Sequence, residues 1–328
     1  MKLNCLLLLS VLGLCLACGG GGGEGSAALE EEQDNPNANI VTGALYAIRY
    51  SESTLNQPTL SIGHADSVSH EGLEGAFSGT GDLLGGAKAS DTENTPEVLL
   101  ILRKGNLSAL ASGNYNAAVY GVPSGLQKTC VGQFQLSISS NVTISPYNIS
   151  AENDNISHIE AEFPSASISV NSGSVTWGDW TGGLSQDGSL MLLGLSQGSA
   201  KLYMIVSAQS SAQLSDIEGE EFNNVTAIQY KSDNNEVVAA SGFGPTSFLN
   251  TGKLRFNDMA FTQSSYEITV PTGNRSYRLD ENDSSILDLS AEEGGDITEE
   301  GFVASGADVV IIINPDNEDR PSLVTLFK

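Results

Sequence analysis

Basic residues are scarce in this chain. It contains 14 Lys and Arg against 40 Asp and Glu, which gives a formal net charge of −26 at neutral pH. A surface with this excess of negative charge repels the phosphates of nucleic acids and anionic lipids. We therefore expect no nucleic-acid partner.

Long hydrophobic runs are also lacking. The longest apolar run extends from Leu6 to Leu16, whereas a transmembrane helix needs about 20 apolar residues. We expect a mature chain that is soluble apart from any anchor.

Cysteine is rare as well, with 4 in the whole chain. Cys5 and Cys15 lie within the first 17 residues and Cys18 follows them, which leaves Cys130 alone. One remaining cysteine cannot form an internal disulfide framework. We expect Cys130 to be a small, buried apolar residue.

The first 17 residues have the three parts of a secretory signal peptide. Lys2 supplies the positive charge, an apolar core follows, and small residues precede Cys18. Leu14-Cys15-Leu16-Ala17-Cys18 resembles a bacterial lipobox, in which the final cysteine is acylated and becomes the new N-terminus. The resemblance implies a lipid, such as palmitate, on Cys18. The alternative is an ordinary signal peptide cut after Ala17.

Residues 18–39 are predicted to form a flexible tether. Glycines from Gly19 to Gly23 and acidic or amide residues dominate this segment, so ordering it would not be repaid by burial. A coil of this length has a root-mean-square reach of about 25 Å. By resemblance to Gram-negative lipoproteins, glycine at position 19 implies sorting to the outer membrane of the cell envelope. The face, periplasmic or surface, stays open.

The rest of the chain has the periodicity of β-strands. Apolar and polar residues alternate at 133–139, 166–170 and 266–270, which puts one face inward and one in water. Turn residues such as Asp187-Gly188 separate the runs, and no run has the spacing and caps of a helix. We predict an all-β, antiparallel fold.

A repeat underlies this alternation. Residues 168–177 align with 268–277, 132–136 with 252–256, and 201–206 with 322–327. The repeat divides the chain into a partial β repeat at 40–106 and two β-barrel-like repeats at 107–213 and 214–328. About eight strands per copy is the size of a closed up-and-down barrel of the calycin-like kind. A β-sandwich or a propeller-like fold is the alternative.

Short motifs mark the repeats. Degraded forms of Leu-Ser-Gly-x-Tyr stand at Leu110-Ala-Ser-Gly-Asn-Tyr115 and Leu214-Ser-Asp-Ile-Glu-Gly219, and Asp-Gly-x-Leu stands at 187–190. The pattern resembles a poorly characterised class of bacterial cell-envelope lipoproteins built from tandem β-rich repeats. The resemblance covers most of residues 40–328. It implies architecture and location but no activity.

Two kinds of cluster could hold a metal ion. His64, Asp66 and His70 share one face if residues 62–70 are extended, and these side chains suit zinc or copper. The acidic clusters at 280–283 and 316–319 offer oxygens to calcium, but neither fits the EF-hand pattern. Their plain interpretations are a polar strand face and hairpin turns. We expect no resident cofactor.

The aromatic pair of Trp177 and Trp180 suggests a ligand contact. Trp177 aligns with Tyr277 of the next repeat, which favours core packing. Trp180 has no counterpart, so it is the candidate for an exposed ligand-binding aromatic residue.

Catalytic signals are weak. Gly194-Leu-Ser196-Gln-Gly198 matches the nucleophile elbow of hydrolases, but it is predicted to join two strands, and no histidine follows His158. His158, Glu160 and Glu162 are predicted on the solvated face of a strand. The sequence therefore predicts no enzyme.

Taken together, these features favour a membrane-anchored, non-catalytic binding or structural module. Its partner besides the membrane would be an envelope protein, a glycan or a small molecule. The alternative is a carrier that holds a small apolar or metal ligand inside a barrel. A hydrolase is the distant alternative.

Overall fold

The computed structural model divides into two compact units, Met1–Asp34 and Asn35–Lys328. All described residues belong to the second unit, and most of them are in β-strands, as predicted. No helix within them is long and apolar enough to cross a membrane. The structure describes residues 61–62, 67–70, 73–78, 83–88, 98–126, 128–147, 156–231, 237–256, 260–263, 274–290, 296–304, 306–314 and 321–328.

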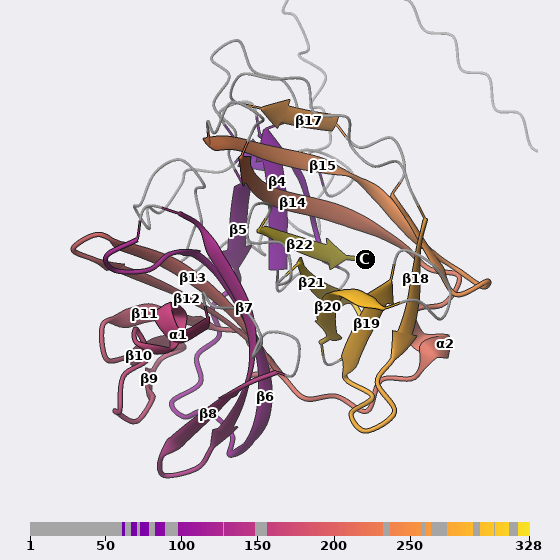
Figure 1. The fold of residues 1–328 in the computed structure, drawn as a ribbon. Coiled ribbons are helices and arrows are strands. Elements are labelled where there is room, and N and C mark those ends of the chain that lie inside the picture. Colours follow the sequence, from indigo (N-terminus) through magenta and orange to yellow (C-terminus); the bar gives the residue numbers. More distant parts are fainter. Residues whose placement is uncertain are drawn as a thin grey trace, which may run out of the picture. The chain divides into compact units, whose positions relative to one another are not determined.

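An N-terminal sheet of five antiparallel strands comes first in the chain (Figure 1). Consecutive strands pair throughout, so the sheet is a meander. Leu100, Ile101 and Leu102 are all buried, which shows that the last strand is covered on both faces. The strands are β1 (Ser61–Ile62), β2 (Ser67–His70), β3 (Leu73–Phe77), β4 (Leu83–Lys88) and β5 (Val98–Leu102).

The second sheet, which we call the open sheet, has eight antiparallel strands. Strands adjacent in the chain pair, except β8 and β9, and the first strand, β6, also pairs with the last, β13. The strand order begins at β8 and ends at β9, so the ring stays open between these two strands. The strands are β6 (Gly113–Val122), β7 (Cys130–Ile138), β8 (Val142–Pro146), β9 (Ser169–Asn171), β10 (Ser174–Trp177), β11 (Trp180–Leu184), β12 (Leu190–Gln197) and β13 (Ala200–Ala208).

The third sheet, which we call the barrel, closes completely. Strand β14 pairs with both β15 and β22, and this pairing joins eight strands into a ring. The ninth strand, β17, pairs with an earlier part of β15 than β16 does, and it lies outside the ring. The predicted up-and-down barrel is therefore confirmed in this part of the chain. The strands are β14 (Glu221–Lys231), β15 (Val237–Leu249), β16 (Lys253–Phe256), β17 (Ala260–Gln263), β18 (Asn274–Leu279), β19 (Ile286–Ser290), β20 (Ile297–Val303), β21 (Val309–Asn314) and β22 (Ser322–Phe327).

Strand alternation divides the apolar side chains among three cores. Phe134 and Leu193 belong to the core inside the open sheet, and Val310 and Ile312 belong to the core inside the barrel. Their neighbours on the opposite strand faces form a third core, which combines residues of all three sheets, among them Leu100, Ile205 and Ile311. The shared core covers the outer faces of several strands whose inner faces are already buried. Burial of apolar area is the main term that stabilises a fold.

Within the described residues, two short helices depart from the predicted all-strand pattern. Along the chain, helix α1 (Ile156–Glu160) follows β8 and precedes β9. Helix α2 (Leu214–Ile217) follows the last strand of the open sheet and precedes the first strand of the barrel. Ile217 of α2 belongs to the barrel core, so the helix covers one end of the barrel interior.

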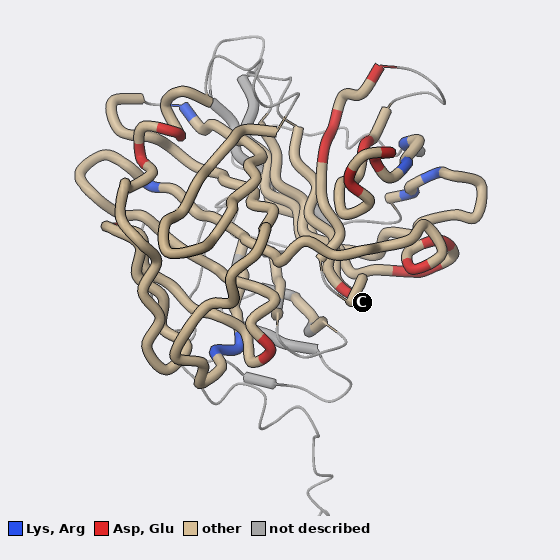
Figure 2. The backbone as a smooth tube through the Cα atoms, turned by 90° about the horizontal axis from the view of Figure 1, so that it is seen from below, with Lys and Arg blue, Asp and Glu red and all other residues tan. Residues whose placement is uncertain are grey.

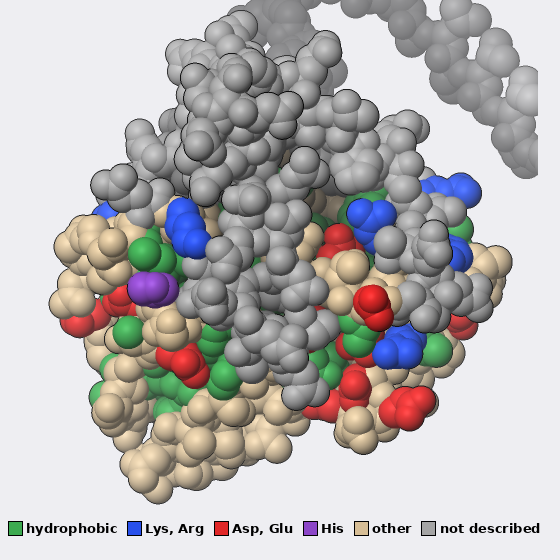
Figure 3. Space-filling model, viewed as in Figure 1, with side chains coloured by type: hydrophobic (Ala, Val, Ile, Leu, Met, Phe, Trp, Pro, Cys, Tyr) green, Lys and Arg blue, Asp and Glu red, His purple; other side chains and the backbone are tan. Residues whose placement is uncertain are grey.

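The two larger sheets differ in charge. Acidic residues are more frequent along the strands and turns of the barrel and in α2 than in the open sheet (Figure 2). On the face seen in Figure 3, acidic and basic side chains lie close together over the barrel. The excess negative charge of the described chain is thus concentrated in its C-terminal part.

The aligned segments correspond at the last strand of each sheet and differ by one strand in the middle. Residues 201–206 and 322–327 occupy the last strand of each sheet, in agreement with the alignment. Residues 132–136 lie on β7, the second strand of the open sheet, whereas 252–256 contain β16, the third strand of the barrel. The alignment of these two segments is therefore wrong by one strand, because strands with alternating apolar and polar residues resemble one another in sequence.

Candidate functional sites

Several predicted sites lie outside the described residues. These are the signal peptide at 1–17, the tether at 18–39 with Cys18, the acidic cluster at 316–319, and His64 and Asp66. His70 is the last residue of β2. Lipidation at Cys18 and metal binding at His64, Asp66 and His70 remain predictions.

Trp180 is buried, and the prediction that it is an exposed contact is wrong. Its side chain on β11 is 0 % exposed, and its Nε1 donates a hydrogen bond to the carbonyl oxygen of Glu162 at 2.9 Å. The ring of Phe163 stacks on both Trp180 and Trp177, with centroids 6.1 and 5.6 Å away. Trp177 is also fully buried, as predicted. These rings fill the interior of the open sheet.

The segment with His158 is helical, so the predicted strand face there is also wrong. In α1, Ile156 and Ile159 are buried while His158 and Glu160 are exposed. The apolar residues are three apart, which is the spacing of one helical face. This Ile-x-x-Ile spacing was the signal that strand alternation concealed.

Ser196 lies in the β12–β13 hairpin and is exposed. The Nζ of Lys201 donates a hydrogen bond to its Oγ at 2.6 Å. A nucleophile elbow requires a strand-to-helix turn. The strand–strand context was predicted correctly.

Cys130 lies on β7 and is 1 % exposed among apolar residues of the open sheet. The prediction of a small buried residue is confirmed.

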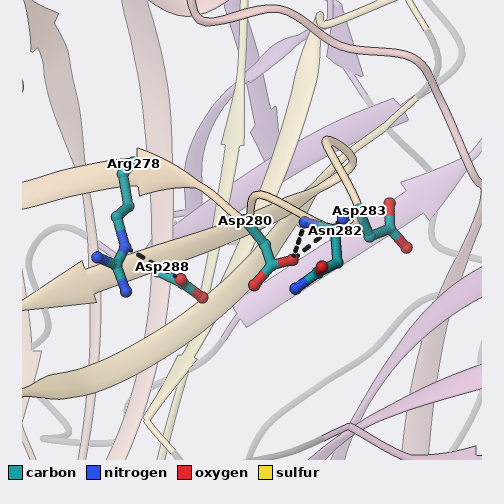
Figure 4. Close-up of polar contacts among 5 residues, drawn as sticks. All are labelled: Arg278, Asp280, Asn282, Asp283 and Asp288. Carbon is teal, nitrogen blue, oxygen red and sulfur yellow. Dashed lines mark hydrogen bonds and ion pairs between the residues drawn. The ribbon is translucent and has the colours of Figure 1, made fainter.

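The acidic cluster at 280–283 forms the turn between β18 and β19. Asp280 Oδ1 accepts hydrogen bonds from the backbone nitrogens of Asn282 at 2.7 Å and Asp283 at 3.0 Å. Asp283 Oδ1 accepts one from the backbone nitrogen of Ser285 at 3.0 Å. The carboxylates of Asp280 and Asp283 point away from each other (Figure 4). Among the described residues, no three His, Cys, Asp or Glu side chains are placed to hold a metal ion.

The same turn joins the barrel to the open sheet. Asp283 Oδ2 accepts hydrogen bonds from Gln135 Nε2 at 3.1 Å and from Gln209 Nε2 at 3.0 Å. Nearby, Asn116 Nδ2 donates to Ser285 Oγ at 2.8 Å, and both residues are fully buried. We call these contacts the polar seam. Because buried polar groups are costly unless paired, they fix how the two sheets meet.

Titratable groups lie beside this seam. Arg278 Nε and Asp288 Oδ2 are 3.3 Å apart on neighbouring strands (Figure 4). Burial raises the pKa of Asp288, and the neighbouring Arg278 offsets only part of this effect. Burial and the carboxylates of Asp280, Asp288 and Glu300 raise the pKa of Tyr147 well above its usual range. Tyr147 therefore stays a neutral hydrogen-bond donor.

The barrel interior contains a buried amide–hydroxyl cluster. Asn224 and Thr246 are 0 % exposed and Thr226 is 4 % exposed. Asn224 Nδ2 donates to Thr246 Oγ1 at 2.9 Å, and Thr226 Oγ1 donates to Asn224 Oδ1 at 2.6 Å. Asn224 and Thr226 share the strand face of Phe222, a barrel-core residue, so alternation places the cluster inside the ring.

A second set of polar residues lies at the end of the barrel away from α2. Arg275 Nε and Glu299 Oε2 are 3.5 Å apart, and their side chains are 25 % and 18 % exposed. Asn314 ends β21, and its buried Oδ1 has no hydrogen-bond partner among the described residues. We call Arg275, Glu299 and Asn314 the polar trio. Sequence reasoning missed it, because its members come from three separate strands.

A hollow of about 580 Å³ lies where the chain passes from the open sheet to α2. Ser210 in its wall donates a hydrogen bond to the carbonyl oxygen of Val303 at 3.1 Å. The hollow is lined by Gln209, Ser210, Ser211, Ala212, Asp216, Gly306 and Ala307.

The chain matches no protein-family model and no curated protein. Among solved structures, it is similar to transferrin binding protein B from Neisseria meningitidis, with a TM-score of 0.27, 13 % identity, and coverage of 79 % of this chain and 51 % of that chain. For transferrin binding protein B from Haemophilus parasuis, the values are 0.27, 9 %, 79 % and 53 %. For a Nostoc punctiforme protein of unknown function from the DUF3598 family, they are 0.19, 10 %, 66 % and 96 %.

This chain spans about half the length of the two transferrin-binding proteins. With TM-scores this low, the likenesses carry no argument about function.

Proposed function

We propose that this chain is a lipid-anchored protein of the bacterial cell envelope whose folded unit is a non-catalytic binding module. The anchor is supported by the first 18 residues, where an apolar run and Leu16-Ala17 precede Cys18. Glycine at position 19 favours the outer membrane. The membrane is then one partner, reached through the lipid on Cys18.

The observation that carries the binding role is the division of the barrel interior. Around α2, the interior is filled by apolar side chains such as Ile217, Phe222 and Leu326. Away from α2, it presents the polar trio. An eight-stranded barrel either fills its interior with side chains or holds one small ligand. A few polar groups converging on an apolar interior are typical of a ligand site.

This division favours a polar ligand over the apolar or metal ligand considered from the sequence. Carboxylate, guanidinium and amide groups bind hydrogen-bonding partners, whereas an apolar ligand would leave Asn314 Oδ1 without a donor. A hydrolase is disfavoured, because Ser196 lies on an exposed strand hairpin.

The anchor is tested by labelling cells with radioactive palmitate. The wild type is compared with Cys18→Ala and with the matched variant Cys15→Ala. We expect label on the wild type and Cys15→Ala and none on Cys18→Ala. Label that persists on Cys18→Ala would disprove the anchor, and protease treatment of intact cells then reports which face the protein occupies.

A further inference from the structure

We propose that the polar trio binds a small zwitterion of the free amino acid kind inside the barrel. This rests on the proposed function, because it names the ligand class of the same binding module. The expected ligand carries one ammonium and one carboxylate group.

The strand register places the trio at interior positions. Arg275 lies opposite Leu254, and Glu299 lies opposite Leu289. Both leucines belong to the barrel core. Asn314 follows Ile312, another core residue, by two positions on β21. Because paired residues share a face and alternate residues on a strand do too, all three polar side chains face inward.

The trio is only partly satisfied by its own contacts. The ion pair of Arg275 and Glu299 reaches from β18 to β20 across the inner face of β19, at 3.5 Å. Burial raises the pKa of Glu299 even with Arg275 beside it. Within the part of the chain that the structure describes, no donor reaches Asn314 Oδ1. A buried acceptor left unpaired bears its full desolvation cost, and it calls for a bound donor.

The arrangement of donors and acceptors selects the ligand class. Glu300 pairs with Ile313 in the β20–β21 ladder, so Glu299 and Asn314 are neighbours across these strands. Both offer oxygen acceptors to an ammonium group. Arg275 offers the guanidinium fork that matches a carboxylate.

Net charge decides among the possible ligands. A simple anion would compete with Glu299 for Arg275 and leave the carboxylate unpaired. A simple cation would compete with Arg275 for Glu299 and leave the guanidinium unpaired. A zwitterion gives each partner a new counter-charge without adding net charge, so neither buried ion is left alone.

The ion pair is partly exposed to solvent, and apolar residues of the barrel core lie beside it. Arg275 and Glu299 keep part of their surface in contact with solvent, which leaves a route to the ion pair. Tyr277 and Leu289 are paired on the same inner face next to the trio. An amino acid with an aliphatic side chain, such as leucine, can pack against them.

Thermal unfolding of the full mature chain in detergent tests the ligand class. Each of the standard amino acids is added singly at millimolar concentration. Isocaproate, which lacks the amine of leucine, and isoamylamine, which lacks its carboxylate, are the matched controls. We expect at least one amino acid to raise the Tm by about 2–4 °C. The two leucine analogues should produce less than half of the leucine shift.

The proposal is overturned if no amino acid raises the Tm, or if the single-charge analogues act as well as leucine. Neither result affects the palmitate experiment, so failure of the ligand and failure of the anchor are distinguishable.

Variants then test the residues. Arg275→Gln and Asn314→Leu should each weaken binding of the stabilising amino acid at least about tenfold. Arg278→Gln is the matched control, because Arg278 lies on the same strand, is 64 % exposed and pairs with Asp288. The Tm without ligand confirms that each variant folds. Unchanged affinity in both trio variants, or an equal loss in Arg278→Gln, would contradict the assignment.

Discussion

The open sheet and the barrel share an up-and-down strand order in which the first and last strands pair, yet only the barrel closes. In the barrel, β16 and β18 form the ladder between the third and fourth strands of the ring. In the open sheet, the corresponding strands β8 and β9 are separated by the segment that contains α1 and Phe163. This segment contributes Phe163, whose ring stacks on Trp177 and Trp180.

The comparison extends to the two interiors. The open sheet is filled by the stacked rings of Phe163, Trp177 and Trp180. The barrel holds polar groups at interior positions away from α2. An interior filled with aromatic rings is suited to support, and an interior that retains unsatisfied polar groups is suited to binding.

The largest effect on stability is expected when an aromatic ring is removed from the interior of the open sheet. Trp180→Ala removes a fully buried ring and the hydrogen bond to Glu162, and it should lower the free energy of unfolding by about 3–5 kcal/mol. Urea denaturation measures it. Trp180→Phe keeps most of the ring volume and should cost clearly less. A loss below about 1 kcal/mol for the alanine variant would show that these rings do not hold the open sheet together.

A smaller effect is expected at the polar seam. Asp283→Ala removes the shared acceptor of the Gln135 and Gln209 amides and leaves Gln209 only its 3.3 Å hydrogen bond to Asn116 Oδ1, which should cost about 1–3 kcal/mol. The neighbouring Glu281 is exposed, so Glu281→Ala should change stability by less than about 0.5 kcal/mol. Equal losses in the two variants, measured by urea denaturation, would mean that the seam does not couple the sheets.

The smallest effect is a pH dependence of opposite sign in the two sheets. Burial raises the pKa of Glu299 in the barrel, so its folded state holds a proton more tightly than its unfolded state. Its contribution is present below the unfolded pKa of about 4.3 and is lost as pH rises through the folded pKa.

Asp187 in the open sheet behaves in the opposite way. Burial alone would raise its pKa, but hydrogen bonds from Ser185 and Ser189 outweigh burial and lower it. Its contribution is present above the unfolded pKa of about 3.9 and is lost as pH falls through the folded pKa.

Denaturation series over pH 3–7 should therefore diverge for the two variants. Relative to the wild type, Glu299→Gln should gain stability as pH rises, and Asp187→Asn should lose it. Parallel curves for both variants would contradict the opposite environments.

Local patterns in the sequence account for much of the fold. Alternation of Phe134, Leu136 and Ile138 with polar residues predicts the strand β7, and Asp187-Gly188 predicts a turn, where Gly188 has a φ of 79°. The sites depend on long-range contacts instead. Trp180 is buried by Phe163, and Asp283 meets Gln135 across 148 positions of the chain. No local pattern encodes such contacts. For this reason the sequence wrongly predicts that Trp180 is exposed, and it gives no sign of the polar trio.

The central claim is that the barrel interior, and not the open sheet, takes a ligand. Two-dimensional NMR of the isotopically labelled chain, titrated with the most stabilising amino acid, tests it directly. Binding inside the barrel predicts saturable shifts at Arg275, Glu299 and the side-chain amide of Asn314, with the open-sheet residues 113–208 unmoved. Shifts centred on the open sheet, or none at the polar trio, would contradict it.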